Sequence, residues 1–184
     1  MENSKVGKFE NQTRVLELNP IVTLQRVGFK DEMSLCDIGA GSGIFSFAAA
    51  EISSSELFAL EISDSMIDLL KSRIAERNIK NLIIKKVESA VLPIDNNSCD
   101  MALMVTVLHE LENKEFMINE IKRVLIEKGK LVIIEFHKRK TTMGPSIDHR
   151  ISEEYVERLC NANGFNSVDQ FSLGDNFYCS IFQS

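Results

Sequence analysis

The chain has 184 residues, of which 44% are hydrophobic and 26% are charged. This composition is typical of a globular protein with one sizeable core, so we expect a single domain over residues 1–184. The net charge of −6 at pH 7 argues against a general nucleic-acid-binding surface. No apolar run reaches membrane-spanning length, and the polar N-terminus has no signal-peptide pattern, which together predict a cytoplasmic protein.

The four cysteines, at positions 36, 99, 160 and 179, lack the paired spacing of a metal site. Each lies among apolar neighbours in a strand or helix pattern, which predicts buried, reduced thiols. The sequence also contains no serine-centred nucleophile elbow and no cluster of metal ligands, so we expect neither a serine hydrolase nor a metal site.

The first elements of the chain are a polar N-terminus, a helix and a short strand. Residues 1–13 are predicted to be loose, and residues 1–20 are a candidate lid. Pro20 suits the first position of a helix that ends at Gly28. Residues 35–38, apolar except for Asp37, then predict a buried strand.

A glycine-rich turn follows this strand. Gly39, Gly41 and Gly43 alternate with other residues, and the apolar residues 44–50 predict a buried helix directly afterwards. Glycine allows a ligand to approach the backbone closely, and a helix N-terminus presents free N–H groups to a polar or anionic ligand. A strand, a glycine turn and a helix in this order are typical of a nucleotide-cofactor site.

Strands and helices alternate through the rest of the chain. Ser63, Asn113 and Ser152 are candidate helix caps, and Gly129 is expected to end the second of these helices. This alternation predicts an α/β fold with a mostly parallel sheet, and the turn at 174–175 predicts a C-terminal antiparallel hairpin. The predicted strands after the first lie at 56–60, 81–87, 99–105, 130–136, 165–173 and 176–182.

Residues 37–43, with the sequence DIGAGSG, resemble the first motif of class I S-adenosylmethionine-dependent methyltransferases. The resemblance covers about residues 30–182, and it implies a Rossmann-like seven-stranded methyltransferase sheet with helices on both faces. Three further segments are similar to the second, third and fourth motifs of that class, in the right order: residues 59–66, 87–93 and 100–110.

The motif at residues 108–111, LHEL, is similar to the ubiquinone/menaquinone C-methyltransferase-like group of small-molecule methyltransferases. The resemblance therefore implies methyl transfer from S-adenosylmethionine to a small-molecule acceptor, with no nucleic-acid partner.

Acidic residues follow the second and third strands, on the side where ligands bind in such sheets. Glu61 can accept hydrogen bonds from a ribose diol, Glu88 from an adenine amino group, and the Ser89 N–H can reach a ring nitrogen. The alternatives are a solvated charge for Glu61 and a helix-capping acid for Glu88. Together, residue type and resemblance imply cofactor contacts at Asp37, Gly39, Ala40, Gly41, Gly43, Glu61, Ile62, Met66, Glu88, Ser89 and Val105.

Methyl transfer from a sulfonium requires mainly in-line placement of the acceptor and exclusion of water. A base is needed only when the acceptor carries a proton, and His109, after the fourth strand, is the candidate. The alternative is a histidine that holds its own loop. His137 and Arg150 are candidates for contact with the substrate, although the basic run at 137–140 also suits a solvated turn.

Two other functions remain open from the sequence. An NAD-dependent oxidoreductase is disfavoured because Ile44 stands where the dinucleotide fingerprint requires a third glycine, and because the chain closes with a hairpin. A module that binds S-adenosylmethionine without catalysis is also compatible with the motifs, since a fold does not establish a function. The sequence identifies neither the acceptor nor the oligomeric state.

Overall fold

The computed structural model describes residues 6–7 and 9–184, and residues 1–5 and 8 of the expected lid lie outside this range. The chain divides into two compact units, Met1–Pro93 and Ile94–Ser184. A single domain over the whole chain therefore stays a prediction.

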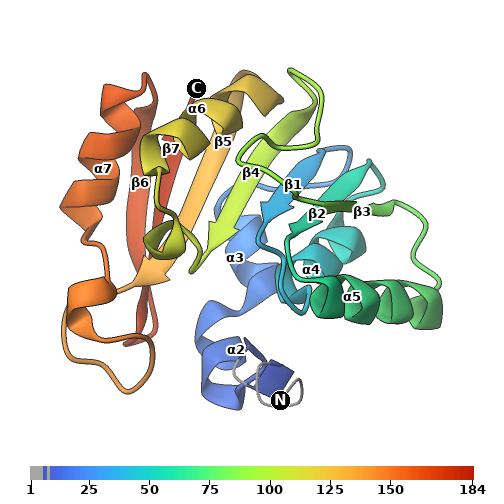
Figure 1. Cartoon of the computed structure of the whole chain (residues 1–184), viewed down its shortest axis with the longest axis horizontal. Helices are drawn as coiled ribbons and strands as arrows, with labels where there is room; N and C mark the ends of the chain where they lie inside the picture. Colours follow the sequence, from blue (N-terminus) through green and yellow to red (C-terminus); the bar gives the residue numbers. More distant parts are fainter. Residues whose placement is uncertain (1–5, 8) are drawn as a thin grey trace. The chain divides into compact units, whose positions relative to one another are not determined.

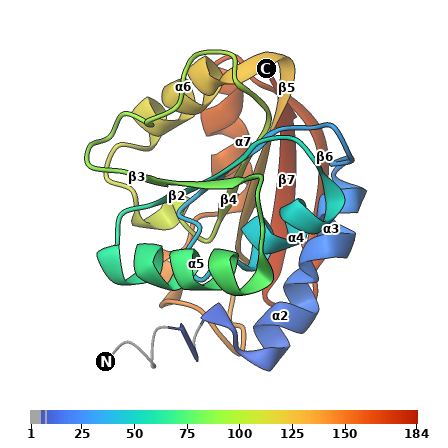
Figure 2. The same cartoon turned by 90° about the vertical axis from the view of Figure 1, so that its right-hand side faces the viewer.

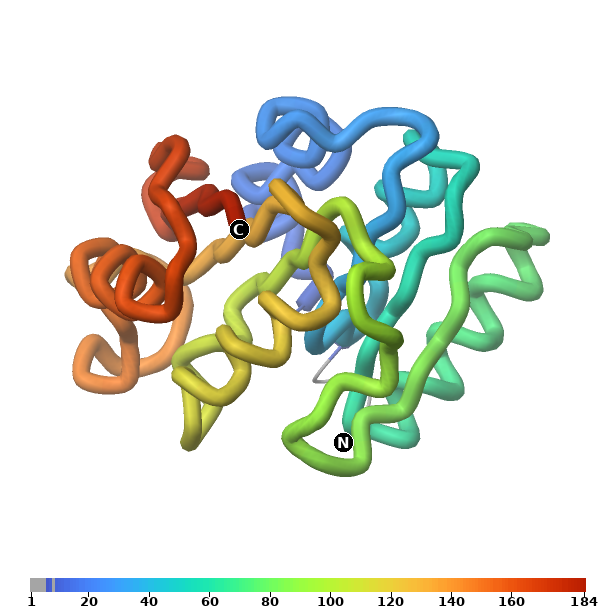
Figure 3. The backbone as a smooth tube through the Cα atoms, turned by 90° about the horizontal axis from the view of Figure 1, so that it is seen from above, coloured from blue at the N-terminus to red at the C-terminus, as the bar shows by residue number. Residues whose placement is uncertain are grey.

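The first unit contains three parallel strands in the order β3-β2-β1 (Figure 1). Helix α4 contacts all three strands. Helix α5 contacts β2 and β3, and Figures 2 and 3 show it running beside these two strands. The elements are α2 (Gln12–Leu18), α3 (Pro20–Arg26), β1 (Leu35–Ile38), α4 (Ile44–Ile52), β2 (Leu57–Glu61), α5 (Asp64–Arg77) and β3 (Leu82–Lys86).

Helix α4 is buried because it is apolar on nearly every side. Phe45, Phe47, Ala48 and Ala49 all lie in the core. The helix packs against α3 as well as against the strands, and every residue of β1 is buried. The turn between β1 and α4 is therefore held at both ends by buried elements.

The second unit contains four strands in the order β4-β5-β7-β6. β4 and β5 are parallel, whereas β7 is antiparallel to both β5 and β6. Helix α6 contacts β5, and α7 contacts β6 and β7 (Figure 1). The elements are β4 (Cys99–Val105), η1 (Leu108–Glu110), α6 (Lys114–Val124), β5 (Leu125–Phe136), η2 (Ile147–His149), α7 (Glu153–Ala162), β6 (Asn166–Leu173) and β7 (Phe177–Gln183).

The predicted fold class is confirmed. In the described part of the chain, a seven-stranded sheet is mostly parallel and closes with the antiparallel hairpin β6–β7. Two predicted helix caps are also confirmed, since Asn113 Oδ1 accepts the Phe116 N–H at 3.0 Å and Ser152 Oγ accepts the Tyr155 N–H at 3.3 Å. Ser63 stands at the N-cap position of α5, but its side chain makes no capping hydrogen bond there.

The predicted end of the second capped helix at Gly129 is wrong. Helix α6 ends at Val124, and β5 begins at once at Leu125. Leu125 is extended and pairs with Cys99 of β4, and the β4–β5 register then shifts before the pairing resumes. Tertiary pairing therefore outweighs the helical pattern of residues 125–129.

The N-terminal part contains more helix than the sequence predicted. Helix α2 is capped by Asn11, whose Oδ1 accepts N–H groups of the first turn, so residues 12 and 13 are not loose. Asn19, with φ 36°, separates α2 from α3, and Pro20 begins α3 as expected.

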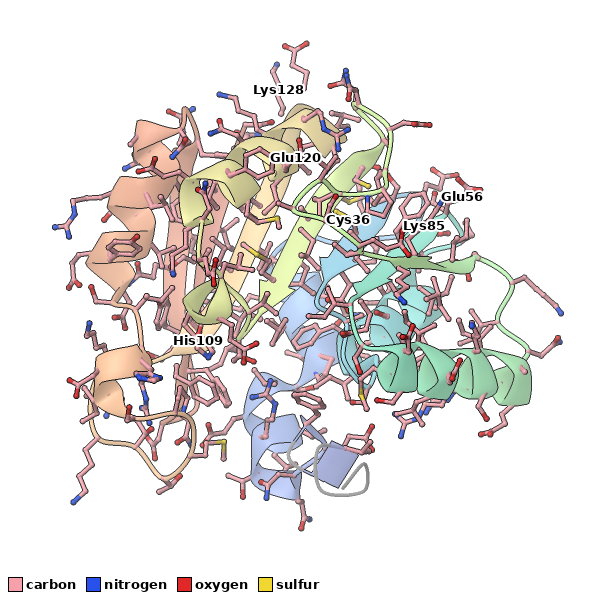
Figure 4. All side chains as sticks on the ribbon, viewed as in Figure 1. Cys36, Glu56, Lys85, His109, Glu120 and Lys128 are labelled. Carbon is pink, nitrogen blue, oxygen red and sulfur yellow. The ribbon has the colours of Figure 1, made fainter. Side chains whose placement is uncertain are left out.

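The predicted state of the cysteines is confirmed, because all four are buried and none of them forms a disulfide bond, including Cys36 within β1 (Figure 4). No helix within the described residues is long and apolar enough to cross a membrane.

Candidate functional site

The glycine turn of the first unit has a left-handed backbone at each of its glycines. The φ angles of Gly39, Gly41 and Gly43 are 74°, 55° and 85°. The N–H groups of Gly39 and Ala40 both donate to the Leu60 carbonyl at 2.9 Å. The turn is therefore fastened to the end of β2, where Glu61 lies.

The buried carboxylate of Glu61 organises the backbone around it. Oε2 accepts the Gly41 N–H at 2.8 Å, and Oε1 accepts the N–H groups of Ile62 and Ser63 at 2.9 Å each. A carboxylate offers about four acceptor positions, so about one of them, at Oε2, is left for a ligand hydroxyl. Glu61 thus joins the glycine turn to the start of α5.

The glycines differ in what a side chain would meet. A Cβ on Gly43 would lie 2.6 Å from atoms of both Leu70 and Phe47, so this glycine is required by core packing. A Cβ on Gly41 would have 3.8 Å to its nearest neighbour, the Phe9 ring. Core packing therefore does not explain why position 41 is a glycine.

Asp37, at 3% exposure, lies beneath the turn and accepts the Ser46 hydroxyl at 2.6 Å. Burial raises the pKa of Asp37 to about 6, against the opposing effect of the Ser46 hydrogen bond, and the charge of Glu61 adds to the rise. Keeping a buried acid charged costs free energy. Acids whose pKa is raised in this way are typical of functional sites.

The N-terminal segment is tied to the same turn. Arg73 of α5 forms an ion pair with Glu10 and donates to the Ser42 carbonyl at 2.8 Å. Phe9 lies over Gly41. The Arg73 hydrogen bond and ion pair lower the pKa of Glu10, against the effect of burial.

Beyond Glu61, the predicted cofactor residues differ in accessibility. The Ile62 side chain is 72% exposed, whereas Met66 is buried. Glu88 and Ser89 follow β3 and are exposed, and Ser89 Oγ accepts the Val91 N–H at 3.2 Å. An apolar surface beside a buried carboxylate suits a nucleoside, with the base on the former and the ribose on the latter.

In the second unit, the backbone is strained directly after Val105, the last residue of β4. Thr106 has φ 56°, a left-handed conformation that β-branched residues rarely adopt, and its N–H donates to the Ile134 carbonyl at 2.7 Å. Strain of this kind clusters at active sites and ligand clamps.

His109 lies just beyond this strained residue, in η1 (Figure 4). Its Nδ1 is 3.0 and 2.8 Å from the two oxygens of Glu135, and its backbone N–H donates to Glu135 Oε1 at 3.1 Å. Burial and the charge of Lys114 lower the pKa of His109, whereas Glu135 and, to a smaller extent, Glu110 raise it. The effect of the two carboxylates is the larger. The pKa of His109 therefore lies above its ordinary value.

His137 forms a second histidine–carboxylate pair, with Nδ1 2.7 Å from Glu153 Oε1. The His137 ring packs against that of Tyr178, with 5.7 Å between the ring centroids. The Nε2 atom of His137 is buried and has no hydrogen-bond partner among the residues that the structure describes.

Arg150 is buried and holds the loop that precedes it. The central carbon of its guanidinium lies over the Phe136 ring, 5.6 Å from the ring centroid. Arg150, which the sequence suggested for contact with the substrate, instead donates hydrogen bonds that hold residues 137–145 in place. Its acceptors are the carbonyls of Pro145, His137, Arg139 and Met143 and the hydroxyl of Thr141, at 2.7–3.0 Å.

The structure thus brings the glycine turn, Asp37 and Glu61 together in the first unit, and His109 close to β5 in the second. Sequence reasoning missed Arg73 and Glu135. Arg73 looks like a solvated helix residue. Glu135 is the one acid in the otherwise apolar residues 131–136 of β5, and this was the available signal. Among the described residues, no group of three or more potential ligands could hold a metal ion.

Residues 36–133, more than half of the chain, match a family model described as a methyltransferase domain. The ubiquinone/menaquinone biosynthesis C-methyltransferase of Cellvibrio japonicus is 26% identical over 119 residues, which cover 63% of this chain and 48% of that protein. The chain therefore spans about half the length of the curated relatives it matches.

Solved structures share the fold over much more of the chain. A methyltransferase from Aquifex aeolicus that depends on S-adenosylmethionine has a TM-score of 0.91 and 22% identity, covering 100% of this chain and 98% of its own. The cyclase SpnF has a TM-score of 0.80 and 18% identity, covering 91% of this chain and 81% of its own. One fold thus occurs in proteins named for different reactions.

Proposed function

Because this chain belongs to the methyltransferase domain family, within the class I S-adenosylmethionine-dependent methyltransferases, we propose that it transfers a methyl group from that cofactor to a small-molecule acceptor. The observation that supports this most is the network of Glu61, which joins the glycine turn to α5 and leaves a carboxylate acceptor beside the exposed Ile62. This arrangement suits an adenosine.

The cofactor, when bound, supplies a methyl group on a positively charged sulfur. The residues that would hold it are those of the glycine turn, Glu61 and Ile62, with Glu88 and Ser89 toward the base. Asp37 supports the turn from below through Ser46. Because the leaving group is a neutral thioether, the protein has mainly to place the acceptor and exclude water.

We propose in addition that residues 1–20 act as a lid. Phe9 lies over Gly41, and Glu10 is paired with Arg73, which also holds the Ser42 carbonyl. A segment attached to the turn at these points can cover a bound cofactor and keep water from it.

The sequence left two alternative functions. Binding of S-adenosylmethionine without catalysis is the first, since a fold does not by itself establish an activity. An NAD-dependent oxidoreductase is the second, and the family match speaks against it. The cytoplasmic location and the absence of a nucleic-acid partner stay predictions.

A metabolite extract incubated with the full chain and S-adenosylmethionine tests the function. Mass spectrometry should show at least one small molecule that gains a single methyl group only when protein and cofactor are both present. With a cofactor labelled at the methyl group, the label should appear in that product. Cofactor binding without any methylated product would favour the binding module.

A further inference from the structure

Glu135 is a buried acid whose contacts centre on one histidine. It is 1% exposed, and both of its oxygens face Nδ1 of His109. It also accepts the backbone N–H of His109 at 3.1 Å and that of Phe136 at 3.3 Å. Such a residue costs stability unless its charge is paired, so its place at the end of β5 requires a physical reason.

These contacts determine which imidazole nitrogen holds the proton. An ionised carboxylate only accepts hydrogen bonds, so the neutral ring must carry its proton on Nδ1. Nε2 is then the nitrogen with a free electron pair. Glu110 Oε1 lies 3.9 Å from Nε2, which is beyond hydrogen-bond distance.

We propose that Glu135 is a positioning residue, which holds His109 in the tautomer whose Nε2 removes a proton from the methyl acceptor. This rests on the proposed function. The acceptor atom forms a bond to the methyl carbon, the methyl–sulfur bond breaks with its electron pair on sulfur, and the acceptor's proton moves to Nε2. The imidazolium that forms is stabilised by the carboxylate of Glu135.

The inference narrows the substrate class. An acceptor that needs a base loses a proton as it is methylated, which selects a hydroxyl, a thiol, a protonated amine or an acidic C–H group. Acceptors without a proton to lose, such as a tertiary amine or a thioether, would gain nothing from the pair. The strained Thr106 backbone, three residues before His109, accords with a built site rather than a passive loop.

The pH dependence follows from the groups that face the ring. Glu135 on β5 and Glu110 in η1 favour the charged imidazole, whereas burial and Lys114 of α6 oppose it. The net effect is a raised pKa, so turnover should fall as the pH falls through a value above the ordinary 6.5 of histidine. Without the carboxylate charge, this acidic limb should move to lower pH.

The test compares the wild type with Glu135→Gln, which keeps an acceptor oxygen but removes the charge. Nuclear magnetic resonance titration of the His109 ring, identified by its loss in His109→Gln, should give a lower pKa in E135Q. With an acceptor from the extract screen, kcat should fall at least about tenfold, with the acidic limb displaced the same way and KM little changed. Glu120→Gln removes the carboxylate that pairs with Arg123 in α6, and it should alter none of these.

The outcomes separate the inference from the proposed function. If E135Q lowers the ring pKa but leaves kcat and the pH profile unchanged, Glu135 only fastens the loop and the inference is wrong. If E135Q does not fold, His109→Gln decides, because normal turnover with a normal acidic limb in that variant excludes a base. If the wild type methylates no acceptor, the proposed function fails, and the inference fails with it.

Discussion

Glu61, the central residue of the candidate cofactor site, both accepts backbone hydrogen bonds and supplies a negative charge, and an alanine substitution would remove both at once. Alanine would leave the N–H groups of Gly41, Ile62 and Ser63 without their acceptor as well as removing the charge. Glutamine keeps one acceptor oxygen. We expect Glu61→Gln to weaken S-adenosylmethionine binding by roughly ten- to a hundredfold in calorimetry, the size of a charged hydrogen bond.

A matched control for this variant lies at the other end of the strand. Glu56 is exposed and immediately precedes β2 (Figure 4), and Glu56→Gln should leave cofactor affinity unchanged. Equal affinities for E61Q and the wild type would show that Glu61 serves only to hold the turn.

Asp37 gives a prediction about stability. Its pKa is about 6 in the folded chain and 3.8 ordinarily, so between these values the folded state binds more protons than the unfolded state. Its contribution to the free energy of unfolding therefore decreases as the pH rises from about 4 to about 6. We expect Asp37→Asn to be more stable than the wild type at pH 8, by about 3 kcal/mol at most.

Urea unfolding of both proteins at pH 4.5 and pH 8 measures this difference, because the other groups titrate alike in the two chains. The advantage of D37N should be clearly smaller at the lower pH. A difference that does not depend on pH would mean that Asp37 is not the titrating group.

Within the glycine turn, Gly43 is required by core packing, whereas Gly41 is the candidate for close approach of the cofactor. Alanine at Gly41 has room but must adopt φ near 55°, which costs roughly 1–2 kcal/mol. Alanine at Gly43 would also collide with Leu70 and Phe47. We expect Gly41→Ala to lose at least about tenfold in cofactor affinity with a modest decrease in melting temperature, whereas Gly43→Ala should lose more stability.

Calorimetry and thermal melting of the two variants test this. Normal cofactor affinity in a folded G41A chain would show that the ligand does not approach the turn at Gly41.

The connection of the N-terminal segment to the turn predicts an effect on rates. Glu10→Gln removes the charge that holds Arg73, and we expect cofactor dissociation to become about two- to fivefold faster, as suits a partly buried ion pair. Stopped-flow release of the bound cofactor measures this. Asp68→Asn, which removes an exposed partner of Lys71 on the same helix, is the control, and equal rates in both variants would exclude a lid that acts through Glu10.

The elements were predictable where one physical signal dominated. The buried strands β1 and β4 were predictable because their residues are mostly apolar, with one aspartate in each. The glycine turn was predictable because glycine adopts a left-handed backbone without strain. Helix α2 was missed because its sequence is polar and its Leu16 is exposed, so that the Asn11 cap was the available signal. The end of α6 was misplaced because Leu125 pairs with a strand that is distant in sequence.

The positions of the candidate site residues were predictable from the sequence, but their hydrogen-bond partners were not. Glu61 is the last residue of β2 and His109 follows the end of β4, on the side where the topology of an α/β sheet places ligands. The partners of such residues come from sequence positions far away. Glu135 lies 26 residues from His109, and Arg73 lies 31 residues from Ser42, so only the fold reveals these contacts.

For the whole molecule, the central claim is that the glycine turn and Glu61 form a site for S-adenosylmethionine. Calorimetric titration of the full chain with S-adenosylmethionine, its demethylated product and NAD tests it most directly. We expect both sulfur compounds to bind at one site per chain, with NAD giving no measurable heat. Tighter binding of NAD than of either sulfur compound would contradict the account.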